Sequence, residues 1–146
     1  MSLAIILLPI VVQSQDASKK SVSGVIVEYM ALKDALVKSD TKKASMAAKN
    51  LSKQMKKGFG DSEMKAVKMI AESDNLVGQR EAFQVVTAGV LEWSKNNDAG
   101  STLYIQHCPM SFGNKGADWL SLSEEVLNPY YGDAMLRCGS VKGKID

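Results

Sequence analysis

The chain has 146 residues, of which 45% are hydrophobic and 23% are charged, and this balance is typical of soluble globular domains. It excludes a chain that is disordered over its whole length, and the length fits one domain with a sizeable core. The 18 basic and 16 acidic residues give a net charge of +2, which is too balanced to indicate nucleic acid as the main partner.

An apolar run, Leu3–Val12, stands at the start of the chain and is followed directly by polar residues. It is too short for a transmembrane helix, which needs about 20 residues, but it has the length of the hydrophobic region of a signal peptide. Val12 and Ser14 are small residues at positions −3 and −1 of a cut before Gln15, so we predict a signal peptide over residues 1–14. No Lys or Arg precedes the run, and a buried N-terminal strand is the alternative. No later segment is apolar enough to span a membrane.

Hydrophobic residues spaced three and four apart predict helices at roughly 21–38, 41–57, 62–72 and 74–96. Short polar or glycine-containing linkers join these segments, as they do in bundles of antiparallel helices. We therefore expect an all-α fold, an antiparallel three- or four-helix bundle that forms a single domain over residues 15–146. Eight apolar residues are expected to be buried together in it: Val25, Tyr29, Leu32, Leu51, Met55, Phe83, Val86 and Val90.

The segment after residue 101 has a different character, because it is rich in proline, glycine and cysteine. Thr102–Ile105 favours an extended, strand-like stretch, and Asn128–Gly132 predicts a turn. Asp133 is placed to cap a short helix over residues 134–137. The sequence thus predicts an irregular C-terminal segment with a short helix, which ends in a polar tail at residues 142–146.

Residues arranged for catalysis are scarce. The chain has one histidine, His107, and it lacks the glycine-rich loops that bind phosphates. His107 and Cys108 are neighbours, and adjacent residues of an extended strand point to opposite faces. His107 is therefore badly placed to activate Cys108, and we expect that the protein is not an enzyme.

Metal ligands and a disulfide are two competing interpretations of the C-terminal segment. His107, Cys108 and Met110 lie within four residues, and Met135 and Cys138 are three apart. Soft sulfur donors combined with an imidazole select Cu(I), whereas Ca²⁺ prefers carboxylates. Alternatively, Cys108 and Cys138 form a disulfide that stabilises the fold by about 3–4 kcal/mol. The residues leave both open, because a reduced pair can bind a metal and an oxidised pair cannot.

Three stretches of the C-terminal segment, Tyr104–Met110, Asn114–Ser121 and Asn128–Gly139, together resemble a family of small secreted bacterial proteins of unknown function. The domain of this family also occurs as an extension on periplasmic adaptor subunits of heavy-metal efflux pumps of the copper and silver type. The resemblance is specific across residues 101–141 and is weaker over the helices, mainly at Tyr29–Leu36 and Gln79–Phe83. It implies a periplasmic helical-bundle domain that is associated with metal efflux.

Donor chemistry and the resemblance point to the same five residues: His107, Cys108, Met110, Met135 and Cys138. We therefore expect a periplasmic protein that binds Cu(I) or a related soft ion there and passes it to an efflux-pump adaptor or another envelope protein. The alternative is an envelope interaction module, stapled by the Cys108–Cys138 disulfide, that docks a partner protein without any metal.

Overall fold

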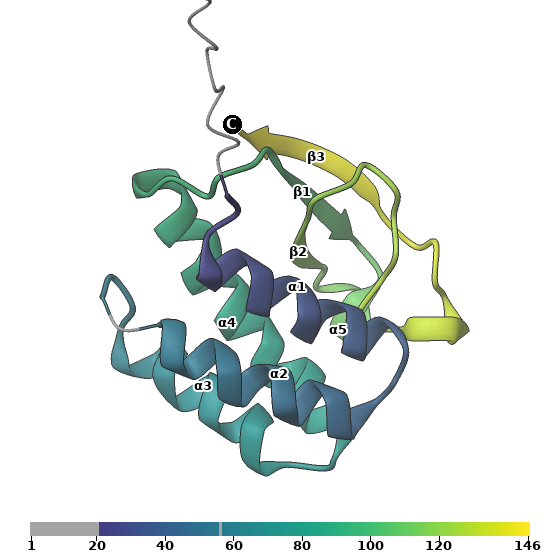
Figure 1. Ribbon diagram of the computed structural model, residues 1–146. Helices are drawn as coiled ribbons and strands as arrows, with labels where there is room; N and C mark the ends of the chain where they lie inside the picture. Colours follow the sequence, from purple (N-terminus) through teal and green to yellow (C-terminus); the bar gives the residue numbers. More distant parts are fainter. Residues whose placement is uncertain (1–20, 56) are drawn as a thin grey trace, which may run out of the picture.

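Four helices form the first part of the computed structural model, which describes residues 21–55 and 57–146. They are α1 (Gly24–Val37), α2 (Thr41–Gln54), α3 (Asp61–Glu72) and α4 (Leu76–Asn96), and each packs against the next (Figure 1). Side-chain oxygens of Ser23, Asp40 and Asn75 accept hydrogen bonds from the first free backbone N–H groups of α1, α2 and α4.

The sequence predicted this helical part well. The observed helices fall within three residues of the predicted boundaries, the largest differences being the start of α1 at Gly24 instead of residue 21 and the end of α2 at Gln54 instead of residue 57. All eight residues expected in the core are buried, and they belong to one continuous hydrophobic cluster. Tyr29 and Phe83 stack at its centre, with ring centroids 5.2 Å apart.

A three-stranded antiparallel sheet contradicts the prediction of an all-α fold, and the chain is a mixed α/β protein. The strands β1 (Leu103–Cys108), β2 (Ala117–Ser121) and β3 (Ser140–Ile145) lie in the order β2-β1-β3. The predicted extended stretch is the start of β1, but β3 was expected to be part of a polar tail. β3 is an edge strand that contains lysines and a glycine and has no buried residue, so its sequence lacks the alternation that marks a half-buried strand.

The prediction of a short helix over residues 134–137 is also wrong. The structure has instead a single 3₁₀ turn at Gly132–Ala134, which ends where Met135 adopts an extended φ of −150°. One further short helix, α5 (Ser111–Asn114), lies in the connection between β1 and β2.

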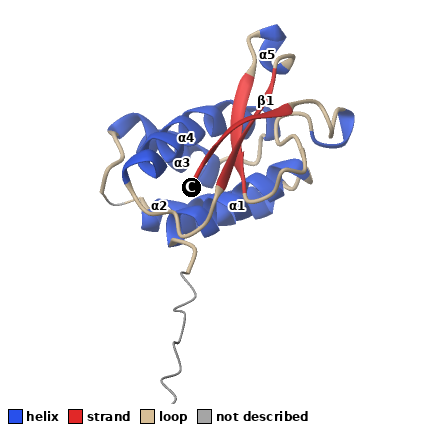
Figure 2. Cartoon of the chain, turned by 90° about the horizontal axis from the view of Figure 1, so that it is seen from above, coloured by secondary structure: helices blue, strands red, loops and turns tan. Residues whose placement is uncertain are grey.

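The sheet lies against the helices, with β2 beside α4 (Figures 1 and 2). Two tyrosine hydroxyls occupy the outer edge of β2. Tyr29 accepts a hydrogen bond from the backbone N–H of Leu120 at 3.1 Å, and Tyr130 donates one to the carbonyl of Asp118 at 2.6 Å. These bonds satisfy backbone groups that an exposed edge strand would leave open.

The turn at residues 128–132 fastens the C-terminal segment to the helices. Within it, the side-chain oxygen of Asn128 accepts bonds from the N–H groups of Tyr130 and Tyr131. Arg80 of α4 donates to the carbonyl of Pro129 at 2.8 Å, and also to the carbonyl of Leu36 at the end of α1. The turn that proline and glycine predicted is confirmed, and Arg80 joins it to two helices.

The predicted signal peptide, residues 1–14, lies outside the described residues. Among the residues that are described, no helix is long and apolar enough to cross a membrane.

Candidate binding sites in the C-terminal segment

Cys108 and Cys138 form a disulfide bond, with their Cα atoms 5.7 Å apart. Cys108, at the end of β1, is fully buried, whereas Cys138 is partly exposed two residues before β3 begins. The bond therefore links the central strand to the chain that enters the edge strand, and it closes a separation of 30 residues. Of the two interpretations that the sequence left open, the disulfide is the one present in the structure.

The two methionines lie in the same two segments as the cysteines. Met110 follows Cys108 by two residues and is 46% exposed, and its carbonyl accepts a hydrogen bond from the Tyr131 hydroxyl at 2.7 Å. Met135 is half-buried, and its carbonyl accepts a bond from the N–H of Cys138 at 3.0 Å. The structure thus brings together the two segments that carry the four sulfur atoms.

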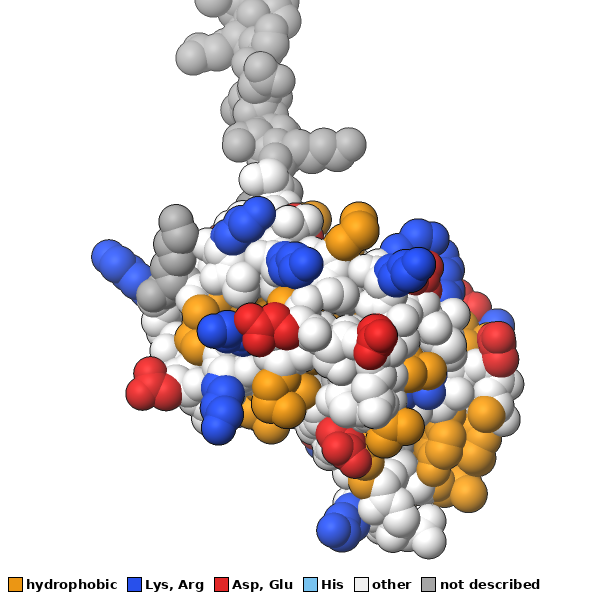
Figure 3. All heavy atoms as spheres, turned by 90° about the horizontal axis from the view of Figure 1, so that it is seen from below, with side chains coloured by type: hydrophobic (Ala, Val, Ile, Leu, Met, Phe, Trp, Pro, Cys, Tyr) orange, Lys and Arg blue, Asp and Glu red, His pale blue; other side chains and the backbone are white. Residues whose placement is uncertain are grey.

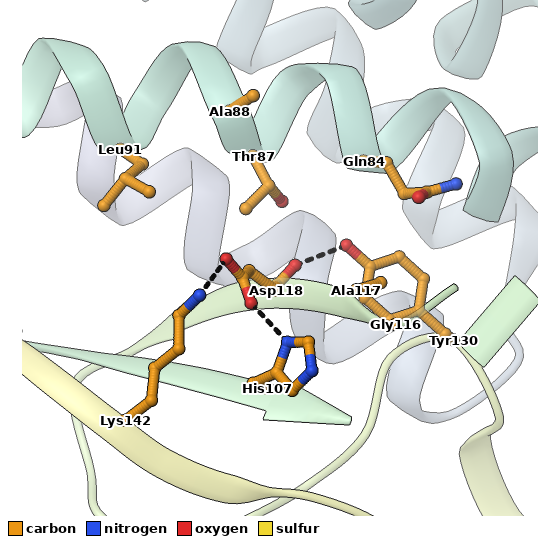
Figure 4. A pocket seen from close by; sticks show the side chains of 10 residues that line it. All are labelled: Gln84, Thr87, Ala88, Leu91, His107, Gly116, Ala117, Asp118, Tyr130 and Lys142. Carbon is orange, nitrogen blue, oxygen red and sulfur yellow. Dashed lines mark hydrogen bonds and ion pairs between the residues drawn. The ribbon is translucent and has the colours of Figure 1, made fainter. Parts of the chain in front are cut away.

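His107 lies on the other face of β1. Its imidazole, together with Asp118, Lys142 and residues of α4, lines a cavity of about 300 Å³ between α4 and the sheet (Figure 4). The face that carries Cys108 is covered instead by the 122–139 segment, whose backbone carbonyls accept hydrogen bonds from Gln106. Alternation along the strand therefore separates the imidazole from the cysteines, as the sequence indicated.

A three-membered charged cluster forms the floor of the cavity. The Nδ1 atom of His107 lies 2.6 Å from Oδ1 of Asp118, its direct cross-strand neighbour. The Nζ atom of Lys142 lies 2.6 Å from Oδ2 of the same carboxylate. In Figure 4 the carboxylate lies between the other two side chains. Asp118 thus contacts the imidazole with one carboxylate oxygen and the ammonium group with the other.

Lys142 reaches Asp118 because β3 contains an irregularity. Ile105 of β1 pairs with Gly143, but the next residue of β1, Gln106, pairs with Val141, so Lys142 is the extra residue between them. The bulge allows the lysine side chain to extend over β1 toward β2 on the side of α4 (Figure 4).

Buried hydroxyl groups form the inner wall of the cavity. The hydroxyls of Tyr29 and Thr87 are 2.8 Å apart, and Thr87 faces the cavity. Burial, as the largest cause, raises the pKa of both Tyr29 and Tyr130 well above the ordinary value of 10.0. Both phenols are therefore neutral hydrogen-bonding groups.

Sequence reasoning did not identify Asp118, Lys142 or Thr87 as site residues. Asp118 lies within one of the stretches that carried the family resemblance, but nothing in the sequence showed that it faces His107. Only the pairing of β1 with β2 places these two residues opposite each other. Lys142 was assigned to a polar tail, and only the bulge in β3 brings it to the cavity.

The described residues contain no group of three or more His, Cys, Asp and Glu side chains arranged to hold a metal ion. Metal binding by the five predicted ligands therefore stays a prediction. The structure divides these residues between two places. One contains the four sulfur-bearing residues, and the other contains His107.

Comparisons with known proteins give one family match. The model of a family described as "protein of unknown function (DUF3347)" matches residues 25–102, which are α1–α4 and the polar loop that leads to β1. No curated protein and no solved structure matches the chain.

Proposed function

The chain belongs to the DUF3347 family of proteins of unknown function, and we propose that it is a soft-metal-binding protein of the bacterial envelope. In this proposal it is not an enzyme; it binds Cu(I) between Cys108 and Cys138 when the pair is reduced and passes the ion to an efflux-pump adaptor or another envelope protein. The resemblance of residues 101–141 supports the location and the partner, and the geometry of the cysteines supports the ligand.

The observation that carries the proposal is the 5.7 Å separation of the Cα atoms of Cys108 and Cys138. Two thiolates on such a scaffold can approach one ion without a large movement of the backbone. Cys108 is fully buried and Cys138 is partly exposed, so an ion can enter from the side of Cys138 and be held away from water at Cys108. Thiolates in an environment of this kind select soft ions such as Cu(I).

Met110 and Met135 are the supplementary donors in this proposal. They flank the two cysteines on the two segments that the disulfide joins, and Met110 is exposed enough to meet an incoming ion. Thioethers are weaker donors than thiolates, so these residues would add affinity and selectivity to a site that the cysteines define.

Competition between the protein and a chromophoric Cu(I) chelator tests the proposal. The reduced protein should withdraw Cu(I) from the chelator, whereas the oxidised protein should withdraw far less. Cys108→Ser and Cys138→Ser should each weaken the competition strongly, and Met110→Leu or Met135→Leu should weaken it less. Leucine is the matched control here, since it preserves volume and removes only the sulfur. Equal competition by the reduced wild type and the double cysteine variant would refute the proposal.

A disulfide-stapled interaction module is the second candidate, and the disulfide itself favours it. This function needs an apolar docking surface, and close in sequence to the two cysteines Met110 and Val141 are exposed. Met110 and Val141, however, are single exposed side chains on two different segments, and the hydrophobic groups that Figure 3 shows lie on the face seen from below. Interaction sites more often have a contiguous apolar patch, so we rank this candidate second.

A further inference from the structure

The two cysteines of the disulfide differ in their access to solvent. Cys108 ends the central strand β1 and has an exposed fraction of 0%, whereas Cys138 lies in the connection that leads to the edge strand β3 and is partly exposed (Figure 1). A thiolate opens a disulfide by attacking one sulfur, and the other sulfur leaves as a thiolate. In the folded protein an incoming thiolate therefore reaches Cys138, and Cys108 is the leaving group.

Contacts other than the disulfide hold Cys138 beside β1. The buried side-chain amide of Asn128 donates to the carbonyl of Cys138 at 2.9 Å, and the N–H of Cys138 donates to the carbonyl of Met135 at 3.0 Å. The next residue, Gly139, has a φ of +135°, and a Cβ atom there would lie 2.8 Å from the carbonyl oxygen of His107. Opening the S–S bond removes none of these contacts, so the two sulfur atoms stay close to each other.

The turn that carries Asn128 is also anchored without the disulfide. The N–H of Asn128 donates to the carbonyl of Leu136 at 2.8 Å, which closes the loop between them. Arg80 of α4 donates to the carbonyl of Pro129, and the Tyr130 hydroxyl donates to a carbonyl of β2. Reduction therefore opens one bond in a segment that keeps its other attachments to the sheet and the helices.

This anchoring decides which kind of thiol can reduce the pair. After attack at Cys138, the released Cys108 thiolate lies beside the mixed disulfide, because the Cα atoms are 5.7 Å apart. It can attack Cys138 and expel the incoming thiol, and such an intramolecular step is favoured over attack by a second external thiol. A single thiol is thus returned unchanged. A dithiol carries its own second thiol, which resolves the mixed disulfide and leaves both cysteines reduced.

We propose that the Cys108–Cys138 disulfide is the substrate of a protein dithiol that forms its mixed disulfide with Cys138. In the first step a thiolate of the partner bonds to Sγ of Cys138, the S–S bond breaks, and its electron pair leaves on Sγ of Cys108. In the second step the other thiolate of the partner attacks the partner sulfur of the mixed disulfide, and Sγ of Cys138 leaves. The partner becomes a disulfide, and its two thiol protons balance those that Cys108 and Cys138 take up.

This exchange rests on the proposed function for its purpose, because the reduced pair is the form that binds Cu(I) there. The two can fail separately. Cu(I) competition uses protein that a phosphine has reduced, so it does not depend on any thiol partner. The exchange experiments contain no copper, so they do not depend on metal binding.

The first test compares Cys108→Ala with Cys138→Ala, which lose the same disulfide and each keep one free thiol. Circular dichroism establishes that both are folded. With Ellman's reagent, the Cys138 thiol should react at least about tenfold faster than the Cys108 thiol, because the rate follows access. In urea both thiols should react alike. Equal rates in the folded variants, or a faster reaction of Cys108, would overturn the proposal.

The second test needs no substitution in this chain. The oxidised wild type is incubated with a dithiol protein of the thioredoxin type, and the matched control is the same protein with its second cysteine changed to serine. The intact dithiol should reduce both cysteines of the folded chain, whereas the single-thiol control should not. Any mixed disulfide that acid quenching preserves should lie on Cys138, with Cys108 free for alkylation, as mass spectrometry of the peptides shows.

Three results of the second test would overturn the proposal. The first is a folded chain that the intact dithiol does not reduce although it reduces the urea-unfolded chain. The second is full reduction by the single-thiol control at the same concentration. The third is a mixed disulfide on Cys108.

Discussion

His107 and Cys108 are neighbours in β1, yet the imidazole lies in the cavity beside α4, whereas the sulfur of Cys108 is bonded to Cys138 on the other face of the sheet. A strand that alternates its side chains cannot direct both residues at one ion. The C-terminal segment therefore separates its soft sulfur donors from its imidazole. Both groups depend on the contacts that hold the segment against the helices.

Removing the disulfide should cost stability without changing the fold. A loop closed over 30 residues contributes about 3–4 kcal/mol in the loop-entropy model. Urea unfolding with and without a reductant should show this difference in the wild type and none in the Cys108→Ser/Cys138→Ser variant. A wild type with the same free energy of unfolding in both conditions would contradict the predicted contribution.

Arg80→Met should destabilise the protein by about 2–3 kcal/mol, because it leaves backbone carbonyls of Pro129 and Leu36 without their donor. Arg137→Met is the matched control, since Arg137 forms only an exposed ion pair with Glu125 and should cost less than about 1 kcal/mol. Chemical denaturation measures both. Equal losses would mean that Arg80 does not fasten the C-terminal segment.

Gly132→Ala should be more harmful than Gly113→Ala, although both residues have positive φ. A Cβ atom at Gly132 would lie 2.8 Å from the Arg80 guanidinium and 2.9 Å from the carbonyl of Val37, whereas a Cβ atom at Gly113 meets nothing within 4 Å. Gly113→Ala should cost about 1–2 kcal/mol for the left-handed backbone alone. The excess loss in Gly132→Ala measures how closely the turn approaches α1, and the absence of an excess would refute this close packing.

Alkaline pH should destabilise the protein through its buried tyrosines. The pKa values of Tyr29 and Tyr130 are raised in the folded state, so below pH 10 the phenols are protonated in both states. Above about pH 10 the unfolded chain releases these protons and the folded chain retains them, so the free energy of unfolding falls as pH rises.

Tyr29→Phe tests this mechanism, with Tyr104→Phe, a partly exposed residue of β1, as the control. At pH 8 the Tyr29 variant should be less stable, because the N–H of Leu120 loses its acceptor. Between about pH 9.5 and 11.5 its stability should fall less steeply than that of the wild type. An unchanged pH dependence in Tyr29→Phe would contradict the assignment.

The helical part could be predicted from the sequence because its signals are local. Hydrophobic spacing identified α1–α4, and the short polar or glycine-containing linkers between them marked their ends. The sheet could not be predicted in the same way. β1 showed an extended tendency, but β2 and β3 are defined by pairing with it, and β3 has no buried face of its own.

The candidate sites, too, could be predicted only in part. Because both residues are cysteines, the sequence predicted that Cys108 and Cys138 share either a disulfide or a metal ion, and the structure shows the disulfide. The partners of His107 depend on the register between β1 and β2 and on the bulge at Lys142. Neither feature has a local sequence signal, so Asp118 and Lys142 became visible only in the folded chain.

X-ray absorption at the copper edge of the reduced, Cu(I)-loaded protein distinguishes a Cu(I) ion held by sulfur alone from one that also binds the imidazole. We expect a first coordination shell that contains only sulfur, and an identical spectrum for His107→Asn. A nitrogen ligand that disappears in His107→Asn would show that the imidazole and the cysteines bind the same ion, and it would contradict the separation of the two sites.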